Sequence, residues 1–282
     1  MTGPALDLGA IDGPVLVFGG PYGNLEATEA LLAKAESLGI PPPRILCTGD
    51  IAAYCADAQA TVERIRGAGI AVVQGNCEDS LGADAKDCGC GFEAGTACDA
   101  LSGQWYAQAR QALDVDAKTW MADLPRHIIF TLAGRRLAAI HGGVERANRF
   151  LFASTEEIEL AGELDAAGVE GIVAGHCGLP FTRLVGARMW HNAGVIGLPA
   201  NDGTPRVWYS LLCPKTEGIM VETRSLDYDH ATAARKMAEC GLPRGYAEAL
   251  HSGLWPSLDV LPAAECNATG RPLVSHSVLW IR

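Results

Sequence analysis

Residues 15–37 read VLVFGGPYGNLEATEALLAKAES, and this stretch decides the fold class. A run of four apolar residues, typical of a buried strand, leads into a glycine-rich loop, and Asn24 then caps the helix that follows. Two further strands are expected at residues 44–47 and 70–73, with a helical pattern over about residues 58–67 between them. This alternation of strands and helices predicts a parallel sheet flanked by helices.

The rest of the chain adds a second set of elements. Helices are expected over about residues 101–113, 156–167, 231–238 and 244–252. Strands are expected over about residues 128–140 (a hairpin around Gly134), 172–174, 182–189, 207–212, 219–223 and 274–281. The later strands indicate a second sheet that is rich in antiparallel pairs. The expected fold class is therefore α/β, in a single domain that spans residues 1–282.

Two regions lack this regular alternation. Residues 77–98 are rich in Gly, Asp, Ala and Cys and show no apolar periodicity, so we interpret them as a long loop or insertion. Residues 255–282 are irregular until the last strand, and we interpret them as a C-terminal extension.

The composition narrows the classes of function. The formal net charge is −11 and no cluster of Lys and Arg stands out, which disfavours a nucleic-acid partner. No apolar run reaches the length of about 18 residues that a membrane helix needs, so no membrane association is expected. Residues 1–4 lack the basic and apolar regions of a signal peptide. We therefore expect a cytoplasmic protein.

The ten cysteines are a further feature of the composition. Without an export signal they are expected to be reduced, and most of them to be small buried side chains. The group Cys77, Cys88, Cys90 and Cys98 could hold zinc or an iron–sulfur cluster through four thiolates. Its spacing matches no standard pattern, so thiols with a packing role, or one disulfide, are the alternative interpretations.

Four polar side chains directly follow predicted strands, namely those of Asp50, Asn76, His141 and His176. A glycine precedes three of them and two glycines follow His141, which lets the backbone turn sharply beside a ligand. Polar residues at the carboxyl ends of sheet strands converge on one crevice. One carboxylate, one amide oxygen and two imidazoles suit Mn²⁺, Fe²⁺ or Zn²⁺. The sequence therefore predicts a site for one divalent transition metal.

The order of these residues resembles that of the calcineurin-like metallophosphoesterases. That family carries Gly-Asp, Gly-Asn-His, His-Gly and Gly-His-x-His motifs, which this chain matches in part at residues 49–50, 75–77, 141–142 and 175–178. Residues 192–199 are similar to the glycine-rich loop of the family's small phosphodiesterase and diadenosine-tetraphosphatase-like branch. The resemblance covers about residues 14–255. It implies a four-layer sandwich, in which two mixed sheets pack face to face with helices outside.

Three positions depart from the family pattern. The first Asp and its partner His fall on Gly20 and Tyr22, and the last His falls on Gly178. In the family these side chains, together with a bridging Asp, hold one of two metal ions. The ligands of the other ion all match polar residues of this chain. The resemblance therefore implies one retained four-ligand site, and it puts a second metal in doubt.

The resemblance also suggests catalytic and phosphate-binding residues. The family's His that helps to protonate the leaving oxygen is replaced by Cys77, whose thiol, with a reference pKa of about 8.5, is a poor equivalent. Cys77 and His141 are nevertheless the candidate catalytic residues. Candidate phosphate contacts are the backbone amides of Gly23 and Asn24 at a helix N-terminus, and the residues His191 and Asn192.

Three other residues, Glu78, Asp79 and Tyr22, can be interpreted in more than one way. Glu78 and Asp79 could act as a general acid or base, but an exposed acidic loop explains them equally well. Tyr22 is interpreted as a packing or stacking residue rather than as a ligand of a second metal.

These features together predict a metal-dependent phosphoesterase. Its substrate would be a small phosphomonoester or phosphodiester, attacked by a metal-activated water at a mononuclear site. One alternative is a binding or sensing protein on a catalytically impaired scaffold, motivated by the departures at the second metal site. The other is a thiol-linked or soft-metal protein that uses the Cys-rich segment.

Overall fold

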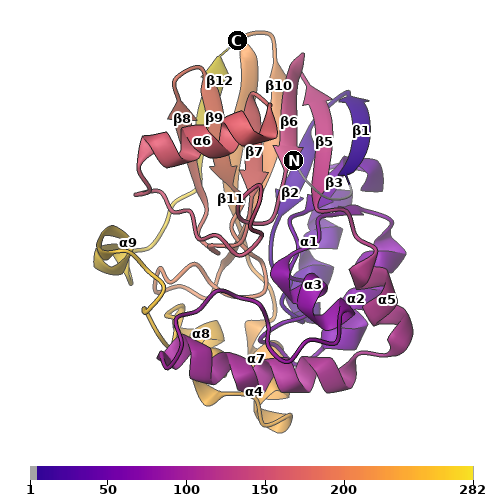
Figure 1. The fold of residues 1–282 in the computed structure, drawn as a ribbon, viewed down its shortest axis with the longest axis vertical. Helices are drawn as coiled ribbons and strands as arrows, with labels where there is room; N and C mark the ends of the chain where they lie inside the picture. The colour runs from indigo at the N-terminus through magenta and orange to yellow at the C-terminus, as the bar shows by residue number, and fades with distance from the viewer. Residues whose placement is uncertain (1–4, 282) are drawn as a thin grey trace.

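The structure is a computed structural model that describes residues 5–281. Two mixed, six-stranded β-sheets lie face to face, and helices cover their outer faces (Figure 1). This arrangement confirms the predicted α/β fold with two packed mixed sheets flanked by helices.

The first sheet has the strand order β12-β11-β10-β2-β3-β4. Its parallel part consists of β2 (Val15–Phe18), β3 (Ile45–Cys47) and β4 (Ala71–Val72), the strands predicted from the amino-terminal sequence. The helices α1 (Leu25–Ser37) and α2 (Ala58–Ala68) connect these strands. The side-chain oxygen of Asn24 accepts a hydrogen bond of 3.1 Å from the Ala27 N–H and so caps α1, as the sequence predicts.

The antiparallel part of the first sheet comes from the end of the chain. It consists of β10 (Val207–Lys215), β11 (Gly218–Leu226) and β12 (His276–Ile281). The strand β10 pairs with β2, and β12 pairs with β11 at the edge. The region interpreted as a C-terminal extension therefore supplies one strand of this sheet.

The second sheet has the strand order β1-β5-β6-β7-β9-β8. Its strands are β1 (Ala5–Ile11), β5 (His127–Leu132), β6 (Arg135–Ala139), β7 (Gly171–Ala174), β8 (Phe181–Val185) and β9 (Arg188–Asn192). The turn between β5 and β6 places Ala133 and Gly134 at positive φ, and it forms the hairpin expected around Gly134.

The remaining helices surround the two sheets. They are η1 (Pro42–Arg44), α3 (Asn76–Gly82), α4 (Ala97–Ala112), α5 (Val115–Ala122), α6 (Glu157–Ala167), α7 (His230–Glu239), α8 (Arg244–Ser252) and α9 (Ala263–Ala268). In Figure 1, α6 lies across the outer face of the second sheet, and α1, α2, α3 and α5 lie together beside the first. None of the helices between residues 5 and 281 is both long enough and apolar enough to cross a bilayer.

The space between the sheets is filled by apolar side chains from both of them. Val15 and Val17 of β2 meet Ile128 and Phe130 of β5, and the ring of Trp280 on β12 lies in the same cluster. All five side chains are nearly inaccessible to solvent. The alternate residues of β2 point outward into the helix layer, so this strand is buried on both faces, as its continuous apolar sequence indicates.

The structure differs from the sequence expectation in its short elements. The segment 77–98, expected to be a loop, begins with the helix α3, which is too short to show an apolar period. The edge strand β1 is mostly exposed and therefore lacks the apolar run that marks a buried strand. The helices α5 and α9 were also not expected, because each is at most eight residues long.

The strand β12 yields a test of how the last part of the chain stabilises the fold. The Trp280 Nε1–H donates to the carbonyl of Ala187 at 2.9 Å, and the guanidinium of Arg135 lies 4.3 Å from the ring centroid. Trp280→Ala should lower the free energy of unfolding by about 3–5 kcal/mol in urea titrations, because it leaves a cavity between the sheets.

Ile281→Ala is the matched control, since the Ile281 side chain is 64% exposed on the same strand. Its effect should stay within about 0.5 kcal/mol. Equal losses for the two variants would contradict a structural role for Trp280.

Candidate metal centre

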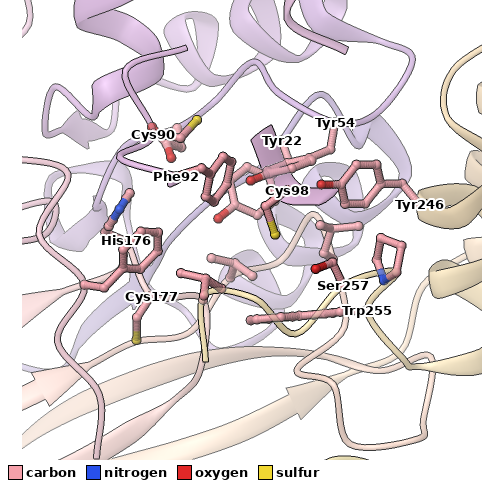
Figure 2. Close-up of a pocket in the computed structure, with 17 residues that line it drawn as sticks. Tyr22, Tyr54, Cys90, Phe92, Cys98, His176, Cys177, Tyr246, Trp255 and Ser257 are labelled. Atoms are coloured by element: carbon pink, nitrogen blue, oxygen red, sulfur yellow. The ribbon is translucent and has the colours of Figure 1, made fainter. Parts of the chain in front are cut away.

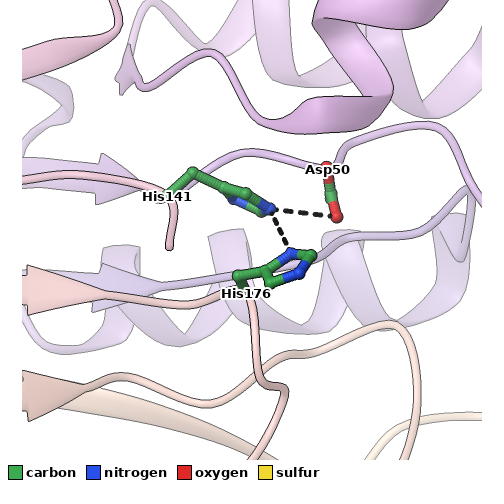
Figure 3. Close-up of side chains that lie close together, drawn as sticks. All are labelled: Asp50, His141 and His176. Carbon is green, nitrogen blue, oxygen red and sulfur yellow. Dashed lines mark hydrogen bonds and ion pairs between the residues drawn. The ribbon is translucent and has the colours of Figure 1, made fainter. Parts of the chain in front are cut away.

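Four side chains from the two sheets converge at one point. Asp50 follows β3 and Asn76 opens α3 after β4, whereas His141 follows β6 and His176 follows β7. The His141 Nε2 atom lies 3.0 Å from Asn76 Oδ1, 2.9 Å from His176 Nδ1 and 3.2 Å from Asp50 Oδ2. Figure 3 shows the two rings and the carboxylate turned toward one another. The structure thus brings together all four residues that the sequence nominated as ligands.

The acceptor atoms around His141 Nε2 outnumber the hydrogen atoms that could lie between them. His141 Nδ1 lies 2.6 Å from the carbonyl oxygen of Thr48 and can only donate to it. The Nε2 atom of the same ring therefore carries at most one hydrogen, yet it faces two oxygens and a nitrogen. The Nδ2 group of Asn76 donates to the carbonyl of Cys88 at 2.9 Å, which turns Oδ1 toward the cluster. Four converging lone pairs fit a divalent cation.

Burial and mutual electrostatic interactions shift the pKa values of the three titratable members of the cluster. Burial opposes ionisation of Asp50, but the neighbouring His141 holds the pKa of Asp50 below its usual value. Burial also opposes charge on His141, yet the Asp50 carboxylate outweighs it and raises the pKa of His141. Burial and the proximity of His141 lower the pKa of His176 to about 3. His176 is therefore neutral at pH 7, which is the form that binds a metal ion.

Glycine permits the close approach of the two loops that carry Asp50 and Asn76. Asp50 has a φ of +59° and follows Gly49, whose φ is +97°. A Cβ atom at Gly49 would lie 2.7 Å from the backbone nitrogen of Gly75, and one at Gly75 would lie 2.4 Å from Asp50 Oδ1. Any larger side chain at either position would separate the loops and move the ligands apart.

The carboxylate of Glu78 holds these two loops together. It is fully buried, and it accepts hydrogen bonds from the backbone N–H groups of Asp50 at 2.7 Å, Ile51 at 2.6 Å and Gly75 at 2.9 Å. Burial and the nearby Asp50 carboxylate raise the pKa of Glu78 to about 7. Of the two interpretations left open by the sequence, the exposed acidic loop is therefore wrong for Glu78.

Cys77 lies next to the ligands but faces the protein interior. Its backbone N–H donates to Asp50 Oδ1 at 3.0 Å, and its side chain packs in the core of the helix layer. Burial, reinforced by the Asp50 carboxylate, raises the pKa of the Cys77 thiol well above its usual value. The backbone of Cys77 thus positions a ligand, and its thiol is poorly suited to proton transfer.

The four candidate phosphate contacts have hydrogen-bond partners of their own. The Gly23 and Asn24 N–H groups already donate to the carbonyls of Ile51 and Pro21, at 2.6 and 2.9 Å. His191 is fully buried in β9 with its Nδ1 atom 2.9 Å from Thr182 Oγ1, and burial lowers its pKa to about 3.

The Oδ1 atom of Asn192 accepts a hydrogen bond of 3.0 Å from the N–H of Gly194 and so shapes the loop after β9. Among the described residues, these four candidates therefore have partners or surroundings that do not involve the metal ligands.

The half of the site that departs from the family pattern contains aromatic side chains. A Cβ atom at Gly20 would lie 2.5 Å from the ring of Tyr22, and one at Gly178 would lie 3.4 Å from the ring of Trp255. The Tyr22 ring also packs against Tyr54, with centroids 4.7 Å apart. Between residues 5 and 281, the one group of three or more His, Cys, Asp or Glu side chains that could hold a metal is Asp50, His141 and His176.

The four cysteines of residues 77–98 do not meet in one cluster. Cys88 and Cys90 are joined by a disulfide, and Cys77 and Cys98 are free and buried. The disulfide segment borders the metal centre, because the Cys88 carbonyl and the Cys90 sulfur both contact the Nδ2 group of Asn76. This geometry favours the disulfide interpretation over a four-thiolate site.

Comparison with known proteins identifies solved structures with a similar fold. No protein-family model matches the sequence, and no curated protein is significantly similar to it. The solved structure of a hypothetical protein, PH1004 from Pyrococcus horikoshii OT3, has a TM-score of 0.69 at 16% identity and covers 86% of this chain and 99% of its own. A metallophosphoesterase from Sphaerobacter thermophilus has a TM-score of 0.67 at 20% identity, with coverage of 86% and 99%.

The chain has the calcineurin-like metallophosphoesterase fold. The resemblance drawn from the sequence motifs is thereby confirmed at the level of the fold.

The three hydrogen bonds that Glu78 accepts lead to a test of whether its carboxylate holds the loops of Asp50 and Gly75 together. Glu78→Gln should lower the free energy of unfolding by about 2–4 kcal/mol, because its amide group would point N–H donors at the backbone N–H groups that now donate to a carboxylate. The variant should also bind Mn²⁺ at least about tenfold more weakly in calorimetric titrations.

Asp79→Asn serves as the control, one residue further along α3. The Asp79 side chain is 55% exposed and pairs with Arg126 at 3.1 Å, so its loss should change stability by less than about 1 kcal/mol. If Glu78→Gln changed stability and Mn²⁺ affinity no more than this control, the proposed role of Glu78 in holding the two loops together would be refuted.

Proposed function

We propose that the protein is a metal-dependent phosphoesterase that hydrolyses a small phosphomonoester or phosphodiester at a mononuclear centre. The observation that carries this proposal is the convergence of four lone-pair donors, from Asp50, Asn76, His141 and His176, at the strand ends of a metallophosphoesterase fold. The mixed oxygen and nitrogen donors suit Mn²⁺, Fe²⁺ or Zn²⁺.

The proposed reaction is a hydrolysis. A bond forms between a water oxygen and phosphorus, the phosphorus–oxygen bond of the ester breaks, and the leaving oxygen takes one proton from the water. A bound divalent ion supplies the acidity of that water and stabilises charge on the phosphoryl oxygens.

The chain's own residues set the geometry of this centre. The carbonyl of Thr48 fixes the ring of His141 and leaves its Nε2 atom for the ion, while Glu78 fixes the loop of Asp50. Phe150 covers the ring of His176, with centroids 4.3 Å apart, and keeps bulk water away from it.

The number of bound ions tests the mononuclear proposal. Elemental analysis of protein incubated with Mn²⁺ and then dialysed should give one ion per chain, since one complete ligand set is present. His176→Ala should reduce this value to well below one. His251→Ala, at an exposed position on α8, should leave it unchanged. Two tightly bound ions per chain would contradict the proposal.

The activity is tested with a chromogenic diester. With Mn²⁺ the full chain should release 4-nitrophenolate from bis(4-nitrophenyl) phosphate, measured by absorbance. His141→Ala should abolish the release, because it removes the ligand at the middle of the cluster, whereas His251→Ala should retain it. Hydrolysis that survives His141→Ala would mean that this centre is not the active site.

A binding or sensing role on the same scaffold is the second candidate. The observation that favours it is Cys77, which stands at the family's proton-donor position with a buried thiol whose pKa is well above its usual value. Such a protein would bind one ion per chain but turn over no member of a broad phosphoester panel with several metals.

A further inference from the structure

A small cavity opens directly beside the metal centre. Its volume is about 60 Å³, roughly that of two water molecules. Asp50 and His176 line it on the side of the metal ligands, and Tyr22 and Gly178 line it at two of the positions that depart from the family pattern. The cavity therefore occupies the half of the site in which related proteins hold a second metal ion.

Six aromatic rings line the cavity. They belong to Tyr22, Tyr54, Phe92, Phe150, Tyr246 and Trp255. Tyr54 packs edge-on against both Tyr22 and Tyr246, with centroids 4.7 and 4.8 Å apart, and Phe92 stacks on Phe150 at 6.1 Å. Figure 2 shows Phe92 and His176 on one side of the cavity, Tyr246 on the other and the Trp255 ring below them.

The wall offers no fixed positive charge. None of the described residues that line the cavity is a lysine or an arginine. The one carboxylate among these lining residues is that of Asp50. A ligand anion would therefore find its only counter-charge in the metal ion, and every additional negative charge would be desolvated without compensation.

The size of the cavity limits what can enter it. A phosphoryl group can lie next to the ligands, but a ring attached to it must lie further out, at the mouth. Phe92 borders the cavity from a segment without helix or strand, between the exposed residues Gly91 and Glu93. Its side chain can turn outward without breaking a helix or a sheet, and a flat ring can then contact Phe150 and Trp255.

We propose that this aromatic pocket selects phosphoesters that carry one negative charge and a flat aromatic group, and that it discriminates against polyphosphates. This inference rests on the proposed phosphoesterase function and names its substrate class. The metal centre would hold the single phosphoryl group, and the aromatic wall would hold the ester group. Hydrogen bonds to a particular ring are not required, so one flat ring can replace another.

The test measures binding rather than turnover. The Mn²⁺-loaded full chain is titrated by calorimetry with three probes: phenyl methylphosphonate, methyl methylphosphonate and methylenediphosphonate, a pyrophosphate analogue. The phenyl ester should bind about tenfold more tightly than the methyl ester, through contact with the aromatic wall. The diphosphonate should bind no more tightly than the phenyl ester, after correction for Mn²⁺ that it chelates in solution.

Two variants locate the binding. Phe92→Ala removes a wall residue on an irregular segment, and Trp255→Phe keeps a ring but removes the Nε1–H that donates to Pro199 at 2.7 Å. Phe92→Ala should reduce the ratio of phenyl to methyl affinity about threefold to tenfold, and Trp255→Phe should reduce it less. Ile158→Ala, an apolar position on α6 that is 81% exposed, should leave the ratio unchanged.

The outcomes separate this inference from the proposed function. Equal affinity for the two monoesters, tighter binding of the diphosphonate, or a ratio that does not respond to Phe92→Ala and Trp255→Phe would each overturn the aromatic pocket. Any of these results could coexist with hydrolysis of a diester. Conversely, a preference for the phenyl ester without hydrolysis of any ester would overturn the enzyme and retain the pocket.

Discussion

The metal centre depends on the close approach of the two sheets at Thr48. This buried residue lies between Gly19 and Gly175, and added Cβ atoms there would lie 2.6 and 2.0 Å from its hydroxyl oxygen. Its carbonyl accepts the hydrogen bond from His141, so the residue joins a loop of the first sheet to a ligand of the second. Because the four ligands come in pairs from different sheets, their distances are set by this contact. A larger side chain at Gly19 or Gly175 would push the two sheets apart and so separate the two pairs of ligands.

The sequence predicted the fold and the ligand positions for the same physical reason. Strands buried on both faces must be continuously apolar, so a polar residue directly after such a run, as at Asp50 or His176, is conspicuous. The role of Glu78 could not be predicted, because an acidic residue in a polar segment normally faces water. Only the folded backbone reveals that three N–H groups point at it. The N–H groups of Gly23 and Asn24, expected to contact phosphate, donate to the carbonyls of Ile51 and Pro21, and hydrogen bonds of this kind also depend on tertiary packing.

The three departures from the family pattern, at residues 20, 22 and 178, together change the chemistry of the site. Where the family pattern has one Asp and two His ligands, this chain has Gly20, Tyr22 and Gly178, and a Cβ atom at Gly178 would lie 3.4 Å from the ring of Trp255. The replacement removes one carboxylate and two imidazoles and leaves a wall lined by six aromatic rings, so an ion held by the remaining ligands would act in surroundings of lower effective dielectric constant. Electrostatic interactions are stronger in such surroundings, which favours a substrate of low charge over one that brings several charges.

The position of β2 in the first sheet has a consequence for how the protein folds. This strand lies between β3 and β10, and its register pairs Val17 with Ser210, which lies 193 residues (210 − 17) further along the chain. A central strand of the first sheet is thus completed by a pairing of very large sequence separation. Closing so long a loop is entropically unfavourable, and folds of high contact order form slowly. Until β10 docks, β2 has an open edge, and partly folded chains are exposed to association through it.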